Sequence, residues 1–272
     1  MKKKISFIGS GKMAQALIGG VIKAGLFPPK NIFISDLATS RLNYLSKKYK
    51  ANKCPDNISA VKISDIVILS VKPKDINLVL SEIKHDVKKK QLFISIAAGI
   101  RIKTLEKHLN NSIVVRAMPN TPALLGHGST AISKGSKAKK TDLKTAIDIF
   151  ESVGHVIVVE EKMMDAVTAV SGSGPAFVYS FVRGMVNAGV KAGLDPKTAK
   201  DLVIKTLIGA GHMLKDLDKS ADELISMVAS PGGTTVAGLS KLDESKFEEA
   251  VGSAIIAAYK RSIEISKEFE AN

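Results

Sequence analysis

The 272-residue chain has very little cysteine: Cys54 is alone, so no intramolecular disulfide can form, and no CxxC or CxxH spacing offers a metal site. Such a sequence is typical of a reducing compartment, and we expect a cytoplasmic protein without a bound metal. Long apolar runs are also missing. Every uninterrupted run is shorter than ten residues, whereas a membrane-spanning helix needs about 20. We therefore expect no membrane span and no cleaved leader.

Acidic residues are scarce beside basic ones, 26 against 40, which gives a net charge of +14. Such a charge raises nucleic acid as a partner. The excess is confined to residues 1–161, which carry +15, whereas residues 162–272 carry −1. Only five of the basic residues are arginine, aromatic residues are few, and neither a recognition motif nor a dense basic stripe is present. We expect a lysine-rich solvated surface and no nucleic-acid partner.

Short β-branched runs alternate with helical patterns over the first 161 residues, as in βαβ units that feed a parallel sheet. The pattern predicts an N-terminal Rossmann domain with a doubly wound sheet over residues 1–161. The expected strands are residues 5–8, 32–35, 66–71, 92–96, 113–116, 131–133 and 156–159. The expected helices are residues 12–24, 40–49, 76–83, 103–109 and 142–153.

Residues 162–272 lack strand signals and read as helices separated by Gly-Pro, Asp-Pro and Pro-Gly-Gly. An all-helical C-terminal domain is expected there. The segment 175–192 is apolar nearly all round, which one small domain cannot bury on one side only. Small residues recur along the predicted helices and would let helices approach closely. We expect this domain to form a homodimer.

A GxGxxA sequence follows the first predicted strand and opens a helix, which is the fingerprint of a dinucleotide-binding turn. Its first glycine permits a tight turn, its second lets a pyrophosphate approach, and its alanine lets the helix pack closely on the strand. The helix N-terminus would receive the phosphates. The fingerprint comprises Gly9, Ser10, Gly11, Lys12, Met13 and Ala14.

Asp36 ends the second predicted strand, 25 residues after Gly11, close to the spacing of a carboxylate that binds ribose hydroxyls. It favours NADH. Thr39, Ser40 and Arg41 follow directly and would serve the 2′-phosphate of NADPH if Asp36 turned aside. Both cofactors, NADPH and NADH, therefore stay open.

Further loops follow strands at the edge where open α/β sheets bind ligands. Small residues after a strand suit a close approach of backbone to a nicotinamide ribose, although a plain helix entry also uses them. The candidates are Val71, Lys72 and Pro73, then Ala97, Ala98 and Gly99, and then Asn120 within the shaped loop 118–122.

The sequence Ser230-Pro-Gly-Gly-Thr-Thr opens a helix in the second half and offers free backbone N–H groups, a helix dipole and two hydroxyls. It would suit a substrate carboxylate, although a simple N-capped helix has the same composition.

These motifs together resemble the pyrroline-5-carboxylate reductase family, and the resemblance extends over essentially the whole chain. It rests on GSGKMA at 9–14, VKP at 71–73, AAG at 97–99, MPNTP at 118–122, SGSGPA at 171–176 and SPGGTT at 230–235. The resemblance implies NAD(P)H-dependent hydride transfer to the cyclic imine of 1-pyrroline-5-carboxylate, giving L-proline in the last step of proline biosynthesis. It also implies a helical domain that interlocks with its twin, and further association, up to a decamer of dimers.

The resemblance also implies roles for individual residues. The glycine loop, Asn57, Val71, Lys72 and Ala98 would lie beside the cofactor. Substrate would be held by Gly232, Gly233, Thr234 and Thr235, while Ser171 and Ser173 would lie near the nicotinamide and the imine, so that the expected catalytic residues are Thr235, Ser171 and Ser173. Asp36 departs from the family, because many relatives carry a Ser or an Asn-Arg pair there for the 2′-phosphate.

Two other functions fit parts of the sequence. A 3-hydroxyacid dehydrogenase-like oxidoreductase would use a Lys and an Asn on one helix, and Asn187 and Lys191 lie four residues apart, but in the reverse order. That function would also leave SPGGTT unexplained. A non-catalytic NADP-binding sensor would share the fold without the chemistry.

Overall fold

The computed structural model describes residues 3–109 and 112–270. By its internal contacts the chain divides into two compact units. The first comprises Met1–Pro175 and Ala258–Asn272, and the second is Ala176–Ala257. The boundary predicted at 161/162 coincides with the end of the sheet. The contacts divide the chain later, after Pro175, because the segment that follows the sheet packs back against it. Division into domains of distinct function at that position stays a prediction.

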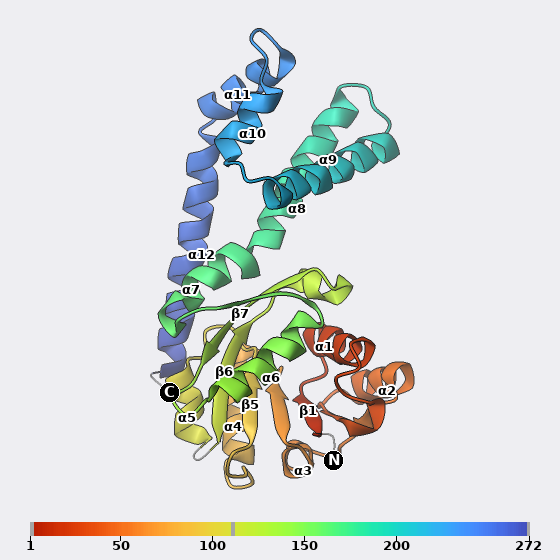
Figure 1. The fold of residues 1–272 in the computed structure, drawn as a ribbon, viewed down its shortest axis with the longest axis vertical. Coiled ribbons are helices and arrows are strands. Elements are labelled where there is room, and N and C mark those ends of the chain that lie inside the picture. The colour runs from red at the N-terminus through yellow and green to blue at the C-terminus, as the bar shows by residue number, and fades with distance from the viewer. Residues whose placement is uncertain (1–2, 110–111, 271–272) are drawn as a thin grey trace. The chain divides into compact units, whose positions relative to one another are not determined.

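The first unit is built on one eight-stranded sheet (Figure 1). The strand order is β3-β2-β1-β4-β5-β6-β7-β8. Strands β2 and β3 are added on one side of β1 and the strands from β4 onward on the other, so the strand order reverses between β1 and β4. The strands are β1 (Ile5–Ile8), β2 (Ile32–Ser35), β3 (Asn52–Lys53), β4 (Ile66–Leu69), β5 (Leu92–Ser95), β6 (Ile113–Met118), β7 (Gly128–Lys134) and β8 (Gly154–Val158).

The first six strands of the chain, β1 to β6, are mutually parallel, as predicted. Strand β7 runs antiparallel to β6, and β8 is parallel to β7. The exception follows from the connection, because residues 119–127 contain only the short 3-10 helix η3 (Thr121–Leu125). A parallel crossover needs a dozen or more residues, usually with an α-helix. The sheet is therefore mixed and mostly parallel.

Helices cover both faces of the sheet, as the doubly wound prediction requires. Along the strands, alternate residues enter two separate cores: Phe7 and Ile68 pack with α1, α2 and α6, whereas Ile8 and Leu69 pack with α3, α4 and α5. The helices are α1 (Lys12–Lys23), α2 (Thr39–Tyr49), α3 (Asn57–Ile63), α4 (Ile76–Ile83), α5 (Ile102–His108) and α6 (Lys140–Glu151).

Short elements complete the first unit. Three 3-10 helices lie in connections: η1 (Pro29–Asn31) between α1 and β2, η2 (Pro73–Asp75) between β4 and α4, and η4 (Glu161–Met163) after β8. After η4 the chain forms one turn of α-helix, α7 (Met164–Val167), and then a π-helical turn, η5 (Thr168–Gly172). π-Helical turns are uncommon and frequent at functional sites.

The second unit is entirely helical, as predicted. It contains most of α8 (Gly174–Lys191), then α9 (Pro196–Asp216), α10 (Ala221–Val228), α11 (Thr234–Glu244) and the start of α12 (Phe247–Glu270), whose remainder belongs to the first unit. Asp195 caps α9 by accepting hydrogen bonds from the N–H groups of Lys197 and Thr198, and Ser220 and Glu223 form a capping box at α10. No residue of α8, α10 or α11 in this described stretch is buried.

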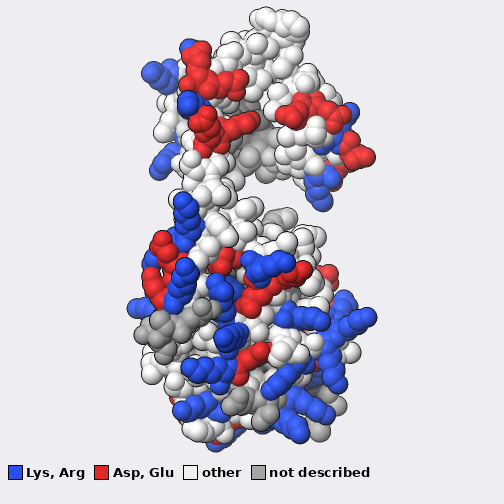
Figure 2. All heavy atoms as spheres, turned by 90° about the vertical axis from the view of Figure 1, so that its left-hand side faces the viewer, with Lys and Arg blue, Asp and Glu red and all other residues white. Residues whose placement is uncertain are grey.

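Basic side chains predominate over the sheet-containing unit on the face drawn in Figure 2. This agrees with the charge split in the sequence. Throughout residues 3–109 and 112–270, each helix is too short or too polar to cross a lipid bilayer.

Candidate cofactor and substrate sites

Five consecutive strands of the sheet, in the order β2-β1-β4-β5-β6, end in loops that carry candidate residues. Asp36 follows β2, Gly9 follows β1, Val71 closely follows β4, Ala97 follows β5, and Asn120 follows β6. Because these strands are parallel, all five loops lie at the carboxyl edge of the sheet. That edge, beside the reversal of strand order, is where open α/β sheets bind their ligands.

The glycine loop has the geometry expected of a phosphate-binding turn. Gly9 has a φ of 93°, and a Cβ there would lie 2.7 Å from the carbonyl carbon of Ser70, so only glycine fits. Gly11 has an extended backbone, and within the described chain no atom comes within 4 Å of a Cβ added there. Ala14 is fully buried. The second glycine therefore opens onto free space, as a pyrophosphate requires.

Helix α1 begins at the glycine loop without competition for an anion. Its N-cap residue is Gly11, no side chain within the described residues caps it, and its first turn holds no acidic residue. The first N–H groups of the helix thus stay available, together with the positive end of the helix dipole. This is the arrangement that binds phosphate in dinucleotide folds.

Asp36 points back at the glycine loop. Its Oδ2 accepts a hydrogen bond from the backbone N–H of Ser10 at 2.5 Å, and its Oδ1 accepts one from Ala38 at 2.7 Å. Arg41 lies close by, and its Nε donates to the carbonyl oxygen of Ser10 at 2.9 Å. Both side chains therefore hold the loop whose backbone would meet the cofactor.

A cavity of about 270 Å³ brings several of these residues together. Five predicted cofactor neighbours line it: Gly9, Asp36, Asn57, Val71 and Lys72. Asn57 is fixed there at both ends of its amide, since its Oδ1 accepts from the Ser35 hydroxyl at 2.8 Å and its Nδ2 donates to Glu82 at 2.7 Å.

The cavity also contains residues that sequence reasoning missed. Leu37 and Leu78 line it although they are 98% and 71% exposed, and Glu82 lies at its wall. Exposed leucines are common and carry no signal in a sequence. Leu37 and Leu78 lie in one cavity with Asp36, the carboxylate expected to bind ribose hydroxyls, and their side chains suit contact with the flat face of an adenine ring.

The remaining predicted residues of the first unit lie outside this cavity. Gly99 has a φ of 77°, and a Cβ there would lie 2.5 Å from Ile265 of α12, so packing alone requires glycine at this position. Pro73 begins η2. Ala97, the first residue of the Ala97–Gly99 turn, is buried. Ala98, between Ala97 and Gly99, is half-buried.

Asn120 joins the β6 loop to the π-helical turn. Its Nδ2 donates to the carbonyl oxygen of Ser171 at 3.1 Å, and its Oδ1 accepts from the N–H of Ser129 at 2.8 Å. The buried hydroxyl of Ser171 has no hydrogen-bond partner in the part of the chain described. Ser173 is half-buried at the end of the turn, and its N–H donates to Thr168. The structure thus brings Asn120 and Ser171 together.

The predicted substrate residues lie in the second unit, where they form the start of α11. Gly232 has a φ of 70°, and Gly233 is the N-cap, within 3.0 Å of the Ser230 carbonyl oxygen through its N–H. Thr234 is exposed and Thr235 half-buried in the first turn. That turn has no side-chain cap among the described residues and no acidic residue, so its N–H groups stay available for a carboxylate.

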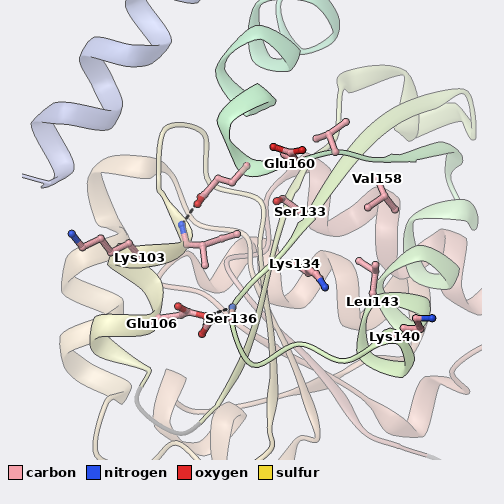
Figure 3. Close-up of a pocket in the computed structure, with 12 residues that line it drawn as sticks. Lys103, Glu106, Ser133, Lys134, Ser136, Lys140, Leu143, Val158 and Glu160 are labelled. Atoms are coloured by element: carbon pink, nitrogen blue, oxygen red, sulfur yellow. Dashed lines mark hydrogen bonds between the residues drawn. The ribbon is translucent and has the colours of Figure 1, made fainter.

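Another cavity, of about 760 Å³, lies elsewhere in the first unit, over β7 and between α5 and α6 (Figure 3). Its carboxylates already have partners: Glu106 accepts from the N–H and hydroxyl of Ser136, and Glu161 accepts from the N–H of Ile102. No predicted site residue lines it.

The fold and the glycine loop define a dinucleotide-dependent oxidoreductase of the Rossmann type with an added helical region. Residues 4–99 match a family model described as NADP oxidoreductase coenzyme F420-dependent, and residues 161–265 match one described as pyrroline-5-carboxylate reductase dimerisation.

Full-length relatives narrow this class. The chain is 42% identical over 266 residues to a pyrroline-5-carboxylate reductase of Methanosarcina acetivorans, covering 97% of this chain and 98% of the relative. It is 40% identical over 269 residues to pyrroline-5-carboxylate reductase 2 of Bacillus subtilis, covering 98% and 96%. A Plasmodium falciparum pyrroline carboxylate reductase structure with NADP bound superposes with a TM-score of 0.90 at 35% identity, covering 98% of this chain and 99% of that one. The chain belongs to the pyrroline-5-carboxylate reductase family.

Proposed function

We propose that this protein is a pyrroline-5-carboxylate reductase, an oxidoreductase that acts on C=N bonds and produces L-proline from 1-pyrroline-5-carboxylate with NAD(P)H. Similarity to family members along the whole chain carries this proposal. It displaces the 3-hydroxyacid dehydrogenase-like alternative, which left the SPGGTT segment without a role. It also displaces a non-catalytic sensor, because the first turn of α11 offers N–H groups and hydroxyls that cofactor binding does not need.

The residues of the first unit suit a nicotinamide dinucleotide. Gly11 opens onto free space, the N-terminus of α1 offers uncapped N–H groups, and a cavity follows beside Asp36. In the proposal the loop Gly9–Ala14 holds the pyrophosphate and Asp36 the adenosine ribose. Asn57, Val71, Lys72 and Pro73 surround the adenosine half and not the nicotinamide ribose expected from the sequence for residues 71–73, because Val71 and Lys72 share a cavity with Asp36. Ala97, Ala98, Gly99 and Asn120, at the ends of β5 and β6, would then face the nicotinamide half.

The chemistry needs a hydride, an electron-poor carbon and a proton on nitrogen. Reduced nicotinamide, when bound, supplies the hydride. A protonated cyclic imine is already electron-poor at carbon, and after hydride addition the ring nitrogen keeps its proton as the amine of proline. The protein therefore has mainly to orient the substrate and to exclude water.

The start of α11 is the proposed substrate clamp. The N–H groups at Gly232 and Thr234 would bind the substrate carboxylate with help from the helix dipole, while Gly233, whose N–H is held by Ser230, would shape the turn beside it. Thr235 would contact the substrate through its hydroxyl. Ser171 and Ser173, in and after the π-helical turn, would relay a proton through water to the ring nitrogen of an imine that binds unprotonated, and the unpartnered Ser171 hydroxyl is free to take such a role.

We also propose a homodimer formed by the helical unit, with a decamer of dimers as the larger assembly, in a cytoplasmic protein. Large apolar side chains of the second unit lie on the surface of a single copy, among them Tyr179 at 61%, Leu202 at 52% and Ile208 at 51% exposure. Such a concentration marks an interaction surface. Light scattering at micromolar concentration should give at least twice the chain mass of 28.9 kDa, and a monomer would refute the dimer.

The reductase activity is tested by mixing the protein with pyrroline-5-carboxylate and NADH or NADPH. Loss of the absorbance of the reduced nicotinamide, with formation of proline, is expected. A protein that instead reduces NAD(P)⁺ with a 3-hydroxyacid, or that binds cofactor without turnover, would support one of the two alternatives.

The clamp is tested by Thr235→Ala beside its matched control Thr235→Ser, which keeps the hydroxyl. Loss of one hydrogen bond in a transition state costs roughly ten- to hundred-fold in kcat/KM. The alanine variant should show that loss while keeping its Tm and its cofactor affinity, and the serine variant should recover most of the activity. Wild-type kinetics in the alanine variant would remove Thr235 from the site.

A further inference from the structure

The side chain of Asn120 joins two backbone segments that lie far apart in the sequence. Its Oδ1 accepts a hydrogen bond from the N–H of Ser129 at 2.8 Å, and its Nδ2 donates one to the carbonyl oxygen of Ser171 at 3.1 Å. The side chain is buried, with 9% exposure. An N–H group needs an acceptor and a carbonyl group needs a donor, and a planar amide presents one of each. The two backbone partners therefore fix the orientation of this amide.

The contact with Ser129 holds Asn120 to the sheet. The last pair between β6 and β7 is Met118 with Ala131, so the same register, continued by two residues, places Asn120 opposite Ser129. The side chain of Asn120 there accepts the N–H that a backbone carbonyl would accept within the ladder. Ser129 itself pairs with His155 of β8. The amide of Asn120 is therefore anchored to a strand that is held from its other side as well.

The carbonyl of Ser171 takes a donor from outside its own helix. In an α-helix this carbonyl would accept the N–H of the residue four positions later. That residue is Pro175, which has no N–H. The π-helical turn η5 closes one residue wider, from the N–H of Ser173 to the carbonyl of Thr168. The Nδ2 of Asn120 thus supplies the donor that Pro175 lacks, at the point where η5 leads into α8.

Close packing holds the same turn against the end of β6. A Cβ added at Gly172 would lie 2.7 Å from the Cε of Met118, two residues before Asn120. The buried hydroxyl of Ser171 has no hydrogen-bond partner among the described residues. Its position therefore depends on the backbone that carries it. Because Asn120 binds the carbonyl of that same residue, it controls where the Ser171 hydroxyl lies, and with it the half-buried Ser173 that follows.

We propose that Asn120 is a positioning residue, which fixes the π-helical turn so that Ser171 and Ser173 lie where the imine is reduced. The proposal rests on the proposed function and adds to it a residue that acts through the two serines and not through contact with the cofactor. A displacement of about 1 Å in a positioned group costs on the order of a hundred-fold in rate. Loss of the Asn120 amide should therefore lower kcat and leave cofactor affinity nearly unchanged.

Asn120→Asp and Asn120→Ala test the proposal in the full-length protein. An ionised aspartate keeps an acceptor for Ser129 but has no donor for Ser171, and alanine has neither. In both variants kcat for the reduction of pyrroline-5-carboxylate should fall about ten- to hundred-fold, while KM for the reduced cofactor changes by less than about threefold. Wild-type kcat in Asn120→Asp would overturn the proposal. A cofactor KM that rises as much as kcat falls would also overturn it, since a direct cofactor contact has that signature.

Pro175→Ala is the matched variant, because it returns an N–H to position 175. The helix can then supply its own donor to Ser171, so Asn120→Asp should lower Tm less in the Pro175→Ala background than in the wild type. Equal losses of Tm in the two backgrounds would contradict the role of Asn120 as a substitute for this donor.

Amide hydrogen exchange of residues 168–174 reports on the turn without catalysis. Exchange there should be about tenfold faster in Asn120→Asp than in the wild type, and unchanged exchange would overturn the proposal. A wild-type protein that reduces no imine would refute the proposed function, and the exchange rates would still decide whether Asn120 fixes the turn.

Discussion

The two glycines of the phosphate-binding turn should respond oppositely to the same change. Gly11→Ala adds a methyl group at a φ of −69° and a ψ of −172°, which any residue adopts, and in the described structure nothing lies within 4 Å of it. Alanine is a poorer N-cap than glycine by about 0.5–1 kcal/mol. It also restricts the unfolded chain, which returns about 0.4–1 kcal/mol. The free energy of unfolding should therefore change by less than about 1 kcal/mol.

Gly9→Ala puts the same methyl group at a φ of 93°, 2.7 Å from the carbonyl carbon and oxygen of Ser70 and 2.9 Å from the nitrogen of Val71. These are backbone atoms of the neighbouring strand connection, which cannot yield as the end of a side chain can. The left-handed conformation costs about 1–2 kcal/mol, and overpacking adds about 1–3 kcal/mol. A loss of about 3 kcal/mol is expected.

Cofactor binding should distinguish the pair further. The open space above Gly11 is where a pyrophosphate would approach, so its methyl group should weaken ADP-ribose binding ten- to hundred-fold, the equivalent of about 1.4–3 kcal/mol. Urea unfolding followed by circular dichroism gives the stability, and calorimetry gives the affinity. The reasoning is refuted if Gly11→Ala loses as much stability as Gly9→Ala, or if it binds ADP-ribose like the wild type.

Two further outcomes follow from buried groups. Glu161→Ala should lower the free energy of unfolding in urea by about 3 kcal/mol. The reason is that it removes the ion-pair partner, at 3.2 Å, of the Arg116 side chain, which is only 3% exposed. The control, Glu160→Ala, changes an exposed carboxylate and should lower this free energy by less than about 1 kcal/mol. Burial, with a smaller contribution from the charge of Asp56, raises the pKa of the Cys54 thiol. Cys54 should therefore react with iodoacetamide at pH 8 at least about tenfold more slowly than free cysteine, and equal rates would show that the thiol is accessible.

Local patterns were enough to predict the sheet strands and the cofactor edge. The β-branched runs at 5–8 and 32–35 match β1 and β2 residue for residue, and the GxGxxA spacing located the turn. The two-residue strand β3 escaped prediction because it is exposed and has no apolar alternation. The helix α3 has only seven residues, too few to show a clear helical period. The antiparallel direction of β7 was missed although no helix was expected between residues 116 and 131, because the βαβ pattern of the preceding strands was extended to this connection, which is too short for a parallel crossover.

Long-range contacts account for the rest of what the sequence did not reveal. Ser262 and Ser266 of α12 donate to the buried carboxylate of Asp165 at 2.7 and 3.3 Å, across about a hundred residues of sequence. The division of one helix between two units therefore follows from tertiary packing.

The Ala97–Gly99 turn shows why a motif and a site are different things. Its string helped to indicate the family, and small residues there were expected to serve a ligand. Gly99 has a physical reason of its own, since its φ of 77° and the 2.5 Å approach of Ile265 exclude any larger residue. Gly11 is the opposite case, because packing within the described chain places no limit on its side chain. A glycine that the fold does not require is the stronger indication of a ligand, so the case for a bound dinucleotide depends on Gly11 more than on Gly99.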